Sequence, residues 1–475
     1  MLDNLQNCVQ LGEKLGAKFV EARYEDLILR TLQRTNDVWR DITLKSRAGV
    51  GVACYYGGAS GYSFTSTITK KNMEAVVSRA FKMAKGSAKS ATLKLDFDRR
   101  PAMDSRKSDT LSVKDHPRDK DLTYKTDLVN RAVDSARKSG ASISNITGMY
   151  GELHGQKLFT NSEGSVIDWN FEIVDLRCTV TSKTVAGHLV NGAEGVGGTK
   201  GLDHYKTPGT TPEDIGKKAG SNAKEQLKAE ACPAGKFRAL VENRLAGVLA
   251  HESFGHLSEG EYVAIGVSPL SGKLGTRLGT KNATIIDHGM PDVPNVGGLW
   301  LPYDDQGTKA SKTTILSKGV LKHYLHSRGT ANYLKQRPTG NCRAIHFGFI
   351  PIPRMTNTYF DAGNLTKEEA LELLDTGVYA IQTSGGQVEA DGSFVFKAIR
   401  GYWIEKGEVK KPLREVSLSG NILNLLSNVE GATRDFQLYS GYFGGCGKGG
   451  QAPLPVGLGG PELVVSNVTF GGQAN

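Results

Sequence analysis

The chain has 475 residues, of which 39% are hydrophobic and 23% charged, and its net charge at pH 7 is +10. This composition is typical of globular proteins and excludes a disordered or fibrous chain, while the length favours two or three domains. The six cysteines lack CxxC spacing, which argues against a disulfide scaffold and against a four-cysteine zinc module.

The basic charge has two interpretations. A nucleic-acid-binding surface would need lysines and arginines clustered on a helix or stripe, whereas this chain shows only pairs such as Lys217-Lys218 and Lys410-Lys411. We therefore expect lysines spread over several faces and no nucleic acid partner. The first residues lack the pattern of a signal peptide, and no run of about 18 apolar residues could span a membrane, so the expected location is cytoplasmic, away from membranes.

The first half of the chain mixes helical and strand patterns. Apolar residues at helical spacing predict helices over about 2–16, 73–86, 122–137 and 214–228. Strand patterns are found over 19–24, 26–33, 49–56, 151–160, 165–171 and 173–181. The segment 87–120 is rich in Ser, Lys and Asp with little periodicity, so we expect a connecting excursion there. These patterns predict an N-terminal α/β layered domain over residues 1–230.

Beyond Gly235 the pattern changes to short strands broken by glycine and proline. Glycine doublets such as Gly385-Gly386 and Gly459-Gly460 suit tight turns and places where one backbone approaches another. The helices predicted here are few, at about 245–257, 331–334 and after the capping box Thr366-x-x-Glu369. The fold class is therefore α+β, with a β-rich C-terminal domain over residues 231–475 that carries one helix of chemical interest.

The segment His251-Glu252-Ser253-Phe254-Gly255-His256 has the clearest chemical pattern. Neutral imidazoles are good zinc ligands, and the adjacent glutamate could take a proton from water and pass it to a leaving amine. The zinc-protease pattern spaces its histidines at i and i+4, whereas here the spacing is i and i+5. In a regular helix that step turns the side chains about 140° apart. The motif thus predicts a helix widened by a π-type turn, which Gly255 would tolerate.

Two histidines are too few for a catalytic zinc site, and buried histidines bonded to backbone carbonyls would show the same pattern in sequence. Cys446 is the leading third ligand because it lies in a glycine loop, where backbone can approach closely, and because Lys448 nearby would favour its thiolate. A lone cysteine is also compatible with a small core residue. His323, His326 and His346 are further candidates, the first two with a structural role as the favoured alternative.

From about residue 18 onward, the chain resembles the TldD/PmbA family of zinc peptidases. The resemblance is strongest in His251–Gly260, Asp304–Gly307, Thr339–Asn341, Pro353–Tyr359, Gly385–Val388 and Cys446–Lys448. TldD-like subunits keep His-Glu-x3-His and PmbA/TldE-like subunits have lost it, so this chain is similar to the TldD-like kind. Within the matching segments, Arg354 and Asn357 are either peptide contacts or buried structural residues.

The resemblance implies a metalloprotease that hydrolyses peptides or unfolded polypeptide segments. It implies one zinc ion (Zn2+) per catalytic chain, held by His251, His256 and Cys446, with Glu252 activating the zinc-bound water as general base and then acting as acid. Three protein ligands leave one coordination position for water, although cobalt or iron would suit the same ligands. The implied partner is a second subunit, either the same chain or a PmbA/TldE-like paralogue. The alternative is a non-catalytic regulatory or scaffold subunit of such a complex.

Overall fold

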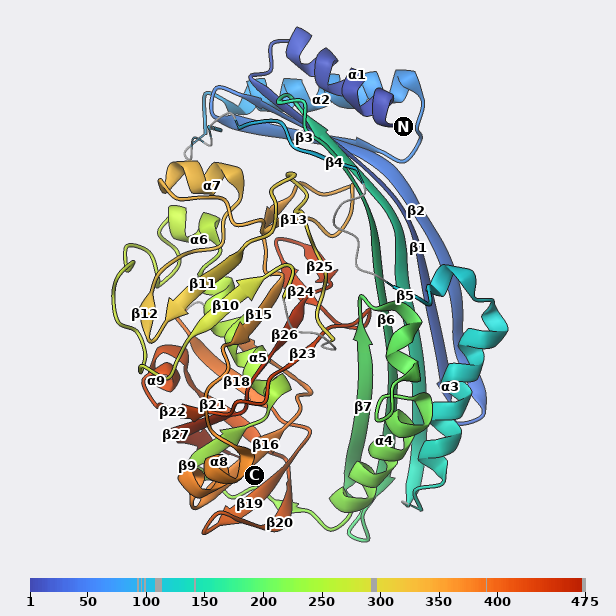
Figure 1. Ribbon diagram of the computed structural model, residues 1–475, viewed down its shortest axis with the longest axis vertical. Helices are drawn as coiled ribbons and strands as arrows, with labels where there is room; N and C mark the ends of the chain where they lie inside the picture. Colours follow the sequence, from blue (N-terminus) through green and yellow to red (C-terminus); the bar gives the residue numbers. More distant parts are fainter. Residues whose placement is uncertain are drawn as a thin grey trace.

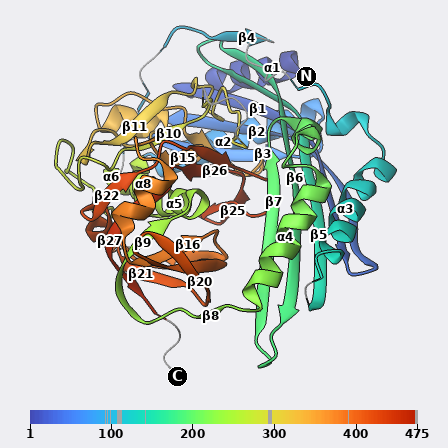
Figure 2. The ribbon, with the colours of Figure 1, turned by 60° about the horizontal axis from the view of Figure 1, so that its bottom comes forward.

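The computed structural model describes residues 1–471 except 92–93, 95, 98–99, 107–112, 141, 292–296 and 390. A large curved sheet from the first half of the chain wraps around several smaller sheets from the second half (Figure 1). The smaller sheets lie on the concave side of the curved sheet in both views (Figure 2). This arrangement confirms the predicted α+β class, while the division into domains 1–230 and 231–475 stays a prediction.

The curved sheet has seven strands in the order β3-β2-β1-β5-β6-β4, with β7 paired to β6. Its strands are β1 (Phe19–Thr35), β2 (Val38–Tyr56), β3 (Ala59–Thr65), β4 (Asp104–Arg106), β5 (Ile143–Asn161), β6 (Val166–Lys183) and β7 (Leu189–Gly198). The predicted breaks at Glu25 and Glu172 are wrong, because β1 and β6 run through them. Both glutamates have partners: Glu25 accepts from the Phe347 amide, and Glu172 lies 2.9 Å from His116 Nδ1.

Four helices cover the outer face of this sheet and confirm the four predicted segments. They are α1 (Leu2–Lys14), α2 (Lys70–Ser87), α3 (Leu122–Arg137) and α4 (Pro212–Gln226). Their apolar stripes build two separate cores, one under α1 and α2 and one under α3 and α4. The expected excursion 87–120 contains β4 and the short 3-10 helix η1 (Pro117–Asp119), and positions 92–93, 95, 98–99 and 107–112 of it lie outside the described residues. A second 3-10 helix, η2 (Gly201–Lys206), follows β7.

The second half forms a ten-stranded sheet, a six-stranded sheet and two hairpins. The ten-stranded sheet contains β8 (Glu230–Ala231), β9 (Gly235–Val241), β16 (Gly377–Ile381), β17 (Gly385–Val388), β18 (Ser393–Lys397), β19 (Arg400–Glu405), β20 (Glu408–Arg414), β21 (Ser417–Asn421), β22 (Val429–Ala432) and β27 (Leu463–Phe470). The six-stranded sheet contains β10 (Ile285–His288), β11 (Lys312–Ser317), β12 (Val320–Leu321), β15 (Asn357–Phe360), β23 (Gln437–Tyr439) and β26 (Gly457–Gly460). The hairpins are β13 (Cys342–Arg343) with β14 (Ile352–Pro353) and β24 (Cys446–Lys448) with β25 (Gln451–Leu454).

The helices of this half are short. They are α5 (Asn243–Ala250), α6 (Gly260–Ala264), α7 (Arg328–Tyr333), α8 (Lys367–Leu374) and α9 (Ile422–Leu426). The capping box predicted at Thr366 and Glu369 is present at the start of α8. Helices α6 and α9 were not predicted, since five residues are too few to show a period. Throughout the described residues, every helix is too short or too polar to cross a membrane.

Helix α5 lies at the centre of the largest core. Leu245 and Leu249 of α5, and Phe254 just after it, pack there against the ten-stranded and the six-stranded sheets. The helix packs so closely on β26 that a Cβ built at Gly247 would lie 2.1 Å from the backbone nitrogen of Gly459. The doublet Gly459-Gly460 therefore serves the close backbone approach expected from its sequence. This packing fixes the start of the histidine motif, because α5 leads directly into it.

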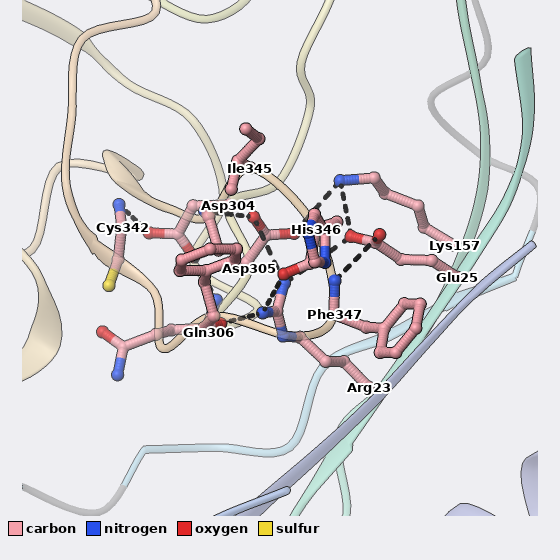
Figure 3. A network of polar contacts seen from close by, with 12 residues as sticks. Arg23, Glu25, Lys157, Asp304, Asp305, Gln306, Cys342, Ile345, His346 and Phe347 are labelled. Carbon is pink, nitrogen blue, oxygen red and sulfur yellow. Dashed lines mark hydrogen bonds and ion pairs between the residues drawn. The ribbon is translucent and has the colours of Figure 1, made fainter. Parts of the chain in front are cut away.

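A buried polar network joins the curved sheet to the second half of the chain (Figure 3). Lys157 Nζ of β5 lies 3.3 Å from both Glu25 and Asp305, and Arg23 of β1 lies within 3.7 Å of the same two carboxylates. The Asp305 carboxylate also accepts from the Ala344 amide. Since two cations balance two anions, the segment beginning at Asp304 has a structural role that holds the two halves together.

Candidate metal centre

Helix α5 continues into a π-helical turn, η3 (His251–Gly255), which confirms the widened helix predicted from the i and i+5 spacing. The backbone N–H of His256 donates to the carbonyl of His251, five residues earlier, as a π turn requires. The two imidazole rings meet nearly at right angles with their centroids 5.2 Å apart. Gly255 makes room for a neighbour, since a Cβ there would lie 1.8 Å from Met355 Sδ.

Cys446, at the start of β24, meets both histidines although it lies 190 positions beyond His256. One potential ligand atom from each of His251, His256 and Cys446 can be chosen so that all three lie within 4.8 Å of one another. The Cys446 Sγ is 3.3 Å from His256 Nε2. The cysteine and His251 are each only 3% exposed, whereas the His256 side chain is 21% exposed, so the cluster is buried except on the side of His256.

The other candidate ligands lie outside this cluster. His326 is fully buried and bonded through its two ring nitrogens to Thr330 and Gln336. His346 accepts a hydrogen bond from the Gly348 amide, and His323 is exposed. The structure therefore favours Cys446 over these histidines as the third ligand.

The charges around the cluster favour a thiolate at Cys446. Burial raises the pKa of this thiol, but attraction and hydrogen bonds from His251 and His256 outweigh burial and lower the pKa to about 4. Burial lowers the pKa of His256, whereas the Glu259 carboxylate and Cys446 raise it to about 11. The two histidines, rather than the predicted Lys448, are thus the residues that lower the pKa of the Cys446 thiol.

Lys448 has a different role, because its ammonium group contacts two carboxylates, the buried one of Glu259 and the partly exposed one of Glu261. It lies 2.9 Å from Glu259 Oε2, forms an ion pair with Glu261, and donates to the Pro353 carbonyl. Glu259 in turn lies 3.0 Å from His256 Nδ1. Lys448 therefore ties the cysteine hairpin to the segment that follows the histidine motif.

The donor set fits a zinc ion. Zinc–nitrogen bonds of about 2.0 Å and zinc–sulfur bonds of about 2.3 Å place tetrahedral ligand atoms roughly 3.5 Å apart, compatible with the observed cluster. Metal-binding histidines commonly bond a carboxylate through the other ring nitrogen, as His256 does with Glu259. The buried Nδ1 of His251 lacks a hydrogen-bond partner within the described part of the chain, so a nitrogen is available there.

Glu252 lies at the edge of the cluster. Its Oε2 is 3.9 Å from His256 Nε2, the ring nitrogen that faces Cys446. Its side chain is 31% exposed, in contrast to the buried His251 and Cys446. The carboxylate can therefore reach water on the open side of the three donors.

Arg354 and Asn357, for which the sequence leaves two roles open, are both buried among backbone groups. Arg354 is fully buried and donates to the backbone carbonyls of Cys446 and Gln451 at 2.8 and 3.2 Å. Asn357 is also fully buried and bonds to backbone groups of His288 and Leu299. Both residues therefore have the structural role left open by the sequence, and neither lies where it would contact a peptide.

Glu259→Gln should weaken zinc binding about 10- to 100-fold, the usual effect of losing the partner of a metal-binding histidine. The neutral amide keeps the size of the side chain but removes the charge that orients His256. Competition with a chromophoric chelator measures the affinity. Glu261→Gln is the matched control, because Glu261 contacts Lys448 without being bonded to His256. Equal zinc affinity in the two variants would contradict this role of Glu259.

Comparison with known proteins identifies the family. Residues 115–227 match the family described as the PmbA/TldA metallopeptidase central domain, and residues 234–472 match its C-terminal domain. The chain belongs to the PmbA/TldD family of metallopeptidases. This membership confirms the resemblance found in the sequence motifs.

Two members of the PmbA/TldD family are similar in sequence to this chain, one over most of its length and one over about half. A metalloprotease of Methanocaldococcus jannaschii is 35% identical over 421 residues, which cover 87% of this chain and 88% of that protein. A zinc metalloprotease TldD homolog of Saccharolobus solfataricus is 34% identical over 248 residues, 52% of this chain and 54% of the relative. The crystal structure of TldE from Thermococcus kodakarensis shares the fold, with a TM-score of 0.74 at 16% identity, covering 99% of this chain and 100% of TldE. The names of the two relatives support a protease role.

Proposed function

We propose that this PmbA/TldD family member is a zinc-dependent peptidase that binds one zinc ion through His251, His256 and Cys446. The convergence of these three donors beside Glu252 carries the proposal. The name of the Saccharolobus solfataricus relative supports zinc as the metal. Three protein ligands leave a position for water, as a catalytic rather than a structural zinc site requires.

A bound zinc ion would supply a Lewis acid that lowers the pKa of water and polarises the scissile carbonyl. The Glu252 carboxylate accepts the proton of the attacking water and then delivers it to the nitrogen of the leaving amine. Glu259 holds the ring of His256, and the buried α5 and β24 keep the donors fixed. The partial exposure of the Glu252 side chain supports a proton transfer on the side open to substrate.

The strand β17 supports extended peptides or unfolded segments as substrates. It is an edge strand of the ten-stranded sheet, and its residues Gly385–Gln387 are exposed. It also contacts the π turn of the histidine motif. A free strand edge can pair with the backbone of an extended peptide, and such pairing tolerates many sequences. A folded protein lacks a free extended backbone and would not bind in this way.

A second subunit is part of the proposal, either another copy of this chain or a TldE-like paralogue. The prevalence of symmetric homo-oligomers supports the first choice, and the shared fold with TldE is compatible with the second. Light scattering on the purified chain, alone and after adding such a paralogue, distinguishes the two.

The proposed function is tested on the purified full chain by metal content and peptide cleavage. About one zinc ion per chain, together with cleavage of an unstructured fluorogenic peptide but not of a folded protein, is the expected result. Chelation should stop cleavage, and added zinc should restore it. A chain that never holds zinc would contradict the proposal. Zinc without cleavage would favour the alternative, a non-catalytic subunit or one that needs its partner.

A further inference from the structure

The loop Ser440–Gly445, which leads into Cys446, lies against the concave face of the seven-stranded sheet. The ring of Tyr442 packs on Gly151 of β5, where a Cβ would lie 2.1 Å from Tyr442 Cδ1, and its hydroxyl is 3.2 Å from Thr31 Oγ1 of β1. Both ribbon views place β25, the second strand of the cysteine hairpin, between α5 and this sheet (Figures 1 and 2). The loop that leads into Cys446 therefore packs along the concave face of the sheet.

Asp175 and Arg177 of β6 bind both polar groups of Phe443, three residues before Cys446. The Phe443 N–H donates to Asp175 Oδ2 at 3.1 Å, and Arg177 Nη2 donates to the Phe443 carbonyl at 2.6 Å. The two side chains also form an ion pair of 2.8 Å with each other. The Arg177 guanidinium lies 5.7 Å from the centroid of the Phe443 ring, within cation–π range. Phe443 is thus held through its backbone and its ring.

The same sheet also holds the helix of the histidine motif. Arg244, near the start of α5, donates to Glu194 Oε1 of β7 at 2.6 Å and to the Gly195 carbonyl at 3.1 Å. Strands β6 and β7 are neighbours, so the contacts to the helix and to the cysteine loop come from one rigid unit. The sheet can therefore set the position of the sulfur relative to the two imidazoles.

Fixing Phe443 matters because the two residues between it and Cys446 are both glycines. Gly444 and Gly445 have φ values of +83° and +132°, a region that glycine visits freely, and a Cβ at Gly444 would meet nothing within 4 Å. On the other side of Cys446, Arg354 and Lys448 hold the hairpin. Without the contacts from β6, the chain before the cysteine would gain conformational freedom, and metal binding would have to restrict it.

We propose that Asp175 and Arg177 are positioning residues of the metal centre, through which the N-terminal sheet presents the Cys446 thiolate to His251 and His256. This inference rests on the proposed zinc site. It assigns the seven-stranded sheet a part in metal binding although none of the three donors lies on it.

The variant that tests the inference is Arg177→Met, because the Arg177 side chain is 43% exposed and its loss should leave the fold intact. We expect zinc affinity to fall about tenfold, the lower bound for lost supporting contacts, and the Phe443 amide to exchange faster with deuterium. Asp175→Asn should also lower zinc affinity, and Arg177→Lys should bind zinc more tightly than Arg177→Met does. Asp168→Asn on the same strand is the control, since Asp168 bonds to Gln156 of the adjacent strand β5.

A double-mutant comparison separates positioning from general damage. If Arg177 acts through the cysteine, Arg177→Met should cause no further loss of zinc affinity in a Cys446→Ser background. An equal loss in both backgrounds would overturn the inference, as would faster exchange of the Phe443 amide with unchanged zinc affinity. Wild-type protein that binds no zinc would overturn the proposed function itself, a result visible before any variant is compared.

Discussion

Glu252→Gln should lower the rate of peptide cleavage about 100- to 10,000-fold while the chain keeps its zinc, because a general acid–base group contributes this much to catalysis. The amide has nearly the same shape as the carboxylate but cannot accept the proton of the attacking water. Glu252 is 31% exposed and lies 3.9 Å from His256, so its loss removes no buried support from the cluster. Cleavage of an unstructured fluorogenic peptide and metal analysis on the same preparation measure the two effects.

Glu368→Gln, at an exposed position in the first turn of α8, is the control for Glu252→Gln and should cleave as the wild type does. If Glu252→Gln cleaved at the wild-type rate, Glu252 would not be the general base. If that variant instead lost its zinc, the carboxylate would act in metal binding.

Cys446→Ser should weaken zinc binding by more than about 100-fold. Even the loss of a residue that only hydrogen-bonds to a zinc ligand lowers zinc affinity about 10- to 100-fold. The serine hydroxyl stays protonated at neutral pH, whereas the pKa of the Cys446 thiol, raised by burial but lowered by the two histidines, is about 4. Cleavage should be lost together with the metal. Chelator competition measures the affinity, and thermal unfolding of the metal-free protein shows that the fold is kept.

Cys232→Ser is the matched control, because Cys232 is another buried cysteine of the second half, and burial raises the pKa of its thiol to about 11. This variant should keep zinc and cleavage. Wild-type zinc affinity in Cys446→Ser would remove the cysteine from the ligand set. The alternatives His323, His326 and His346 would not replace it, because they lie outside the donor cluster.

At the histidine motif the structure agrees with the local sequence pattern. The i and i+5 spacing predicted a widened helix, and η3 is a π turn over His251–Gly255. The capping box at Thr366 and the apolar stripes of α1 to α4 were likewise predicted. These features depend on hydrogen bonds and side-chain spacing among residues close in the chain, so the local sequence determines them.

Other features were decided by the tertiary structure. The sequence left Cys446 among several possible third ligands, and only packing brought it 3.3 Å from His256 across 190 positions. The same holds for the carboxylate of Glu259 behind His256 and for Asp175 and Arg177 beneath the cysteine loop. The local shape of the histidine motif follows from its own residues, because the hydrogen bonds of a helical turn join backbone groups only a few positions apart. Only the fold decided which distant charges surround it, since contacts between remote segments arise from the packing of whole sheets.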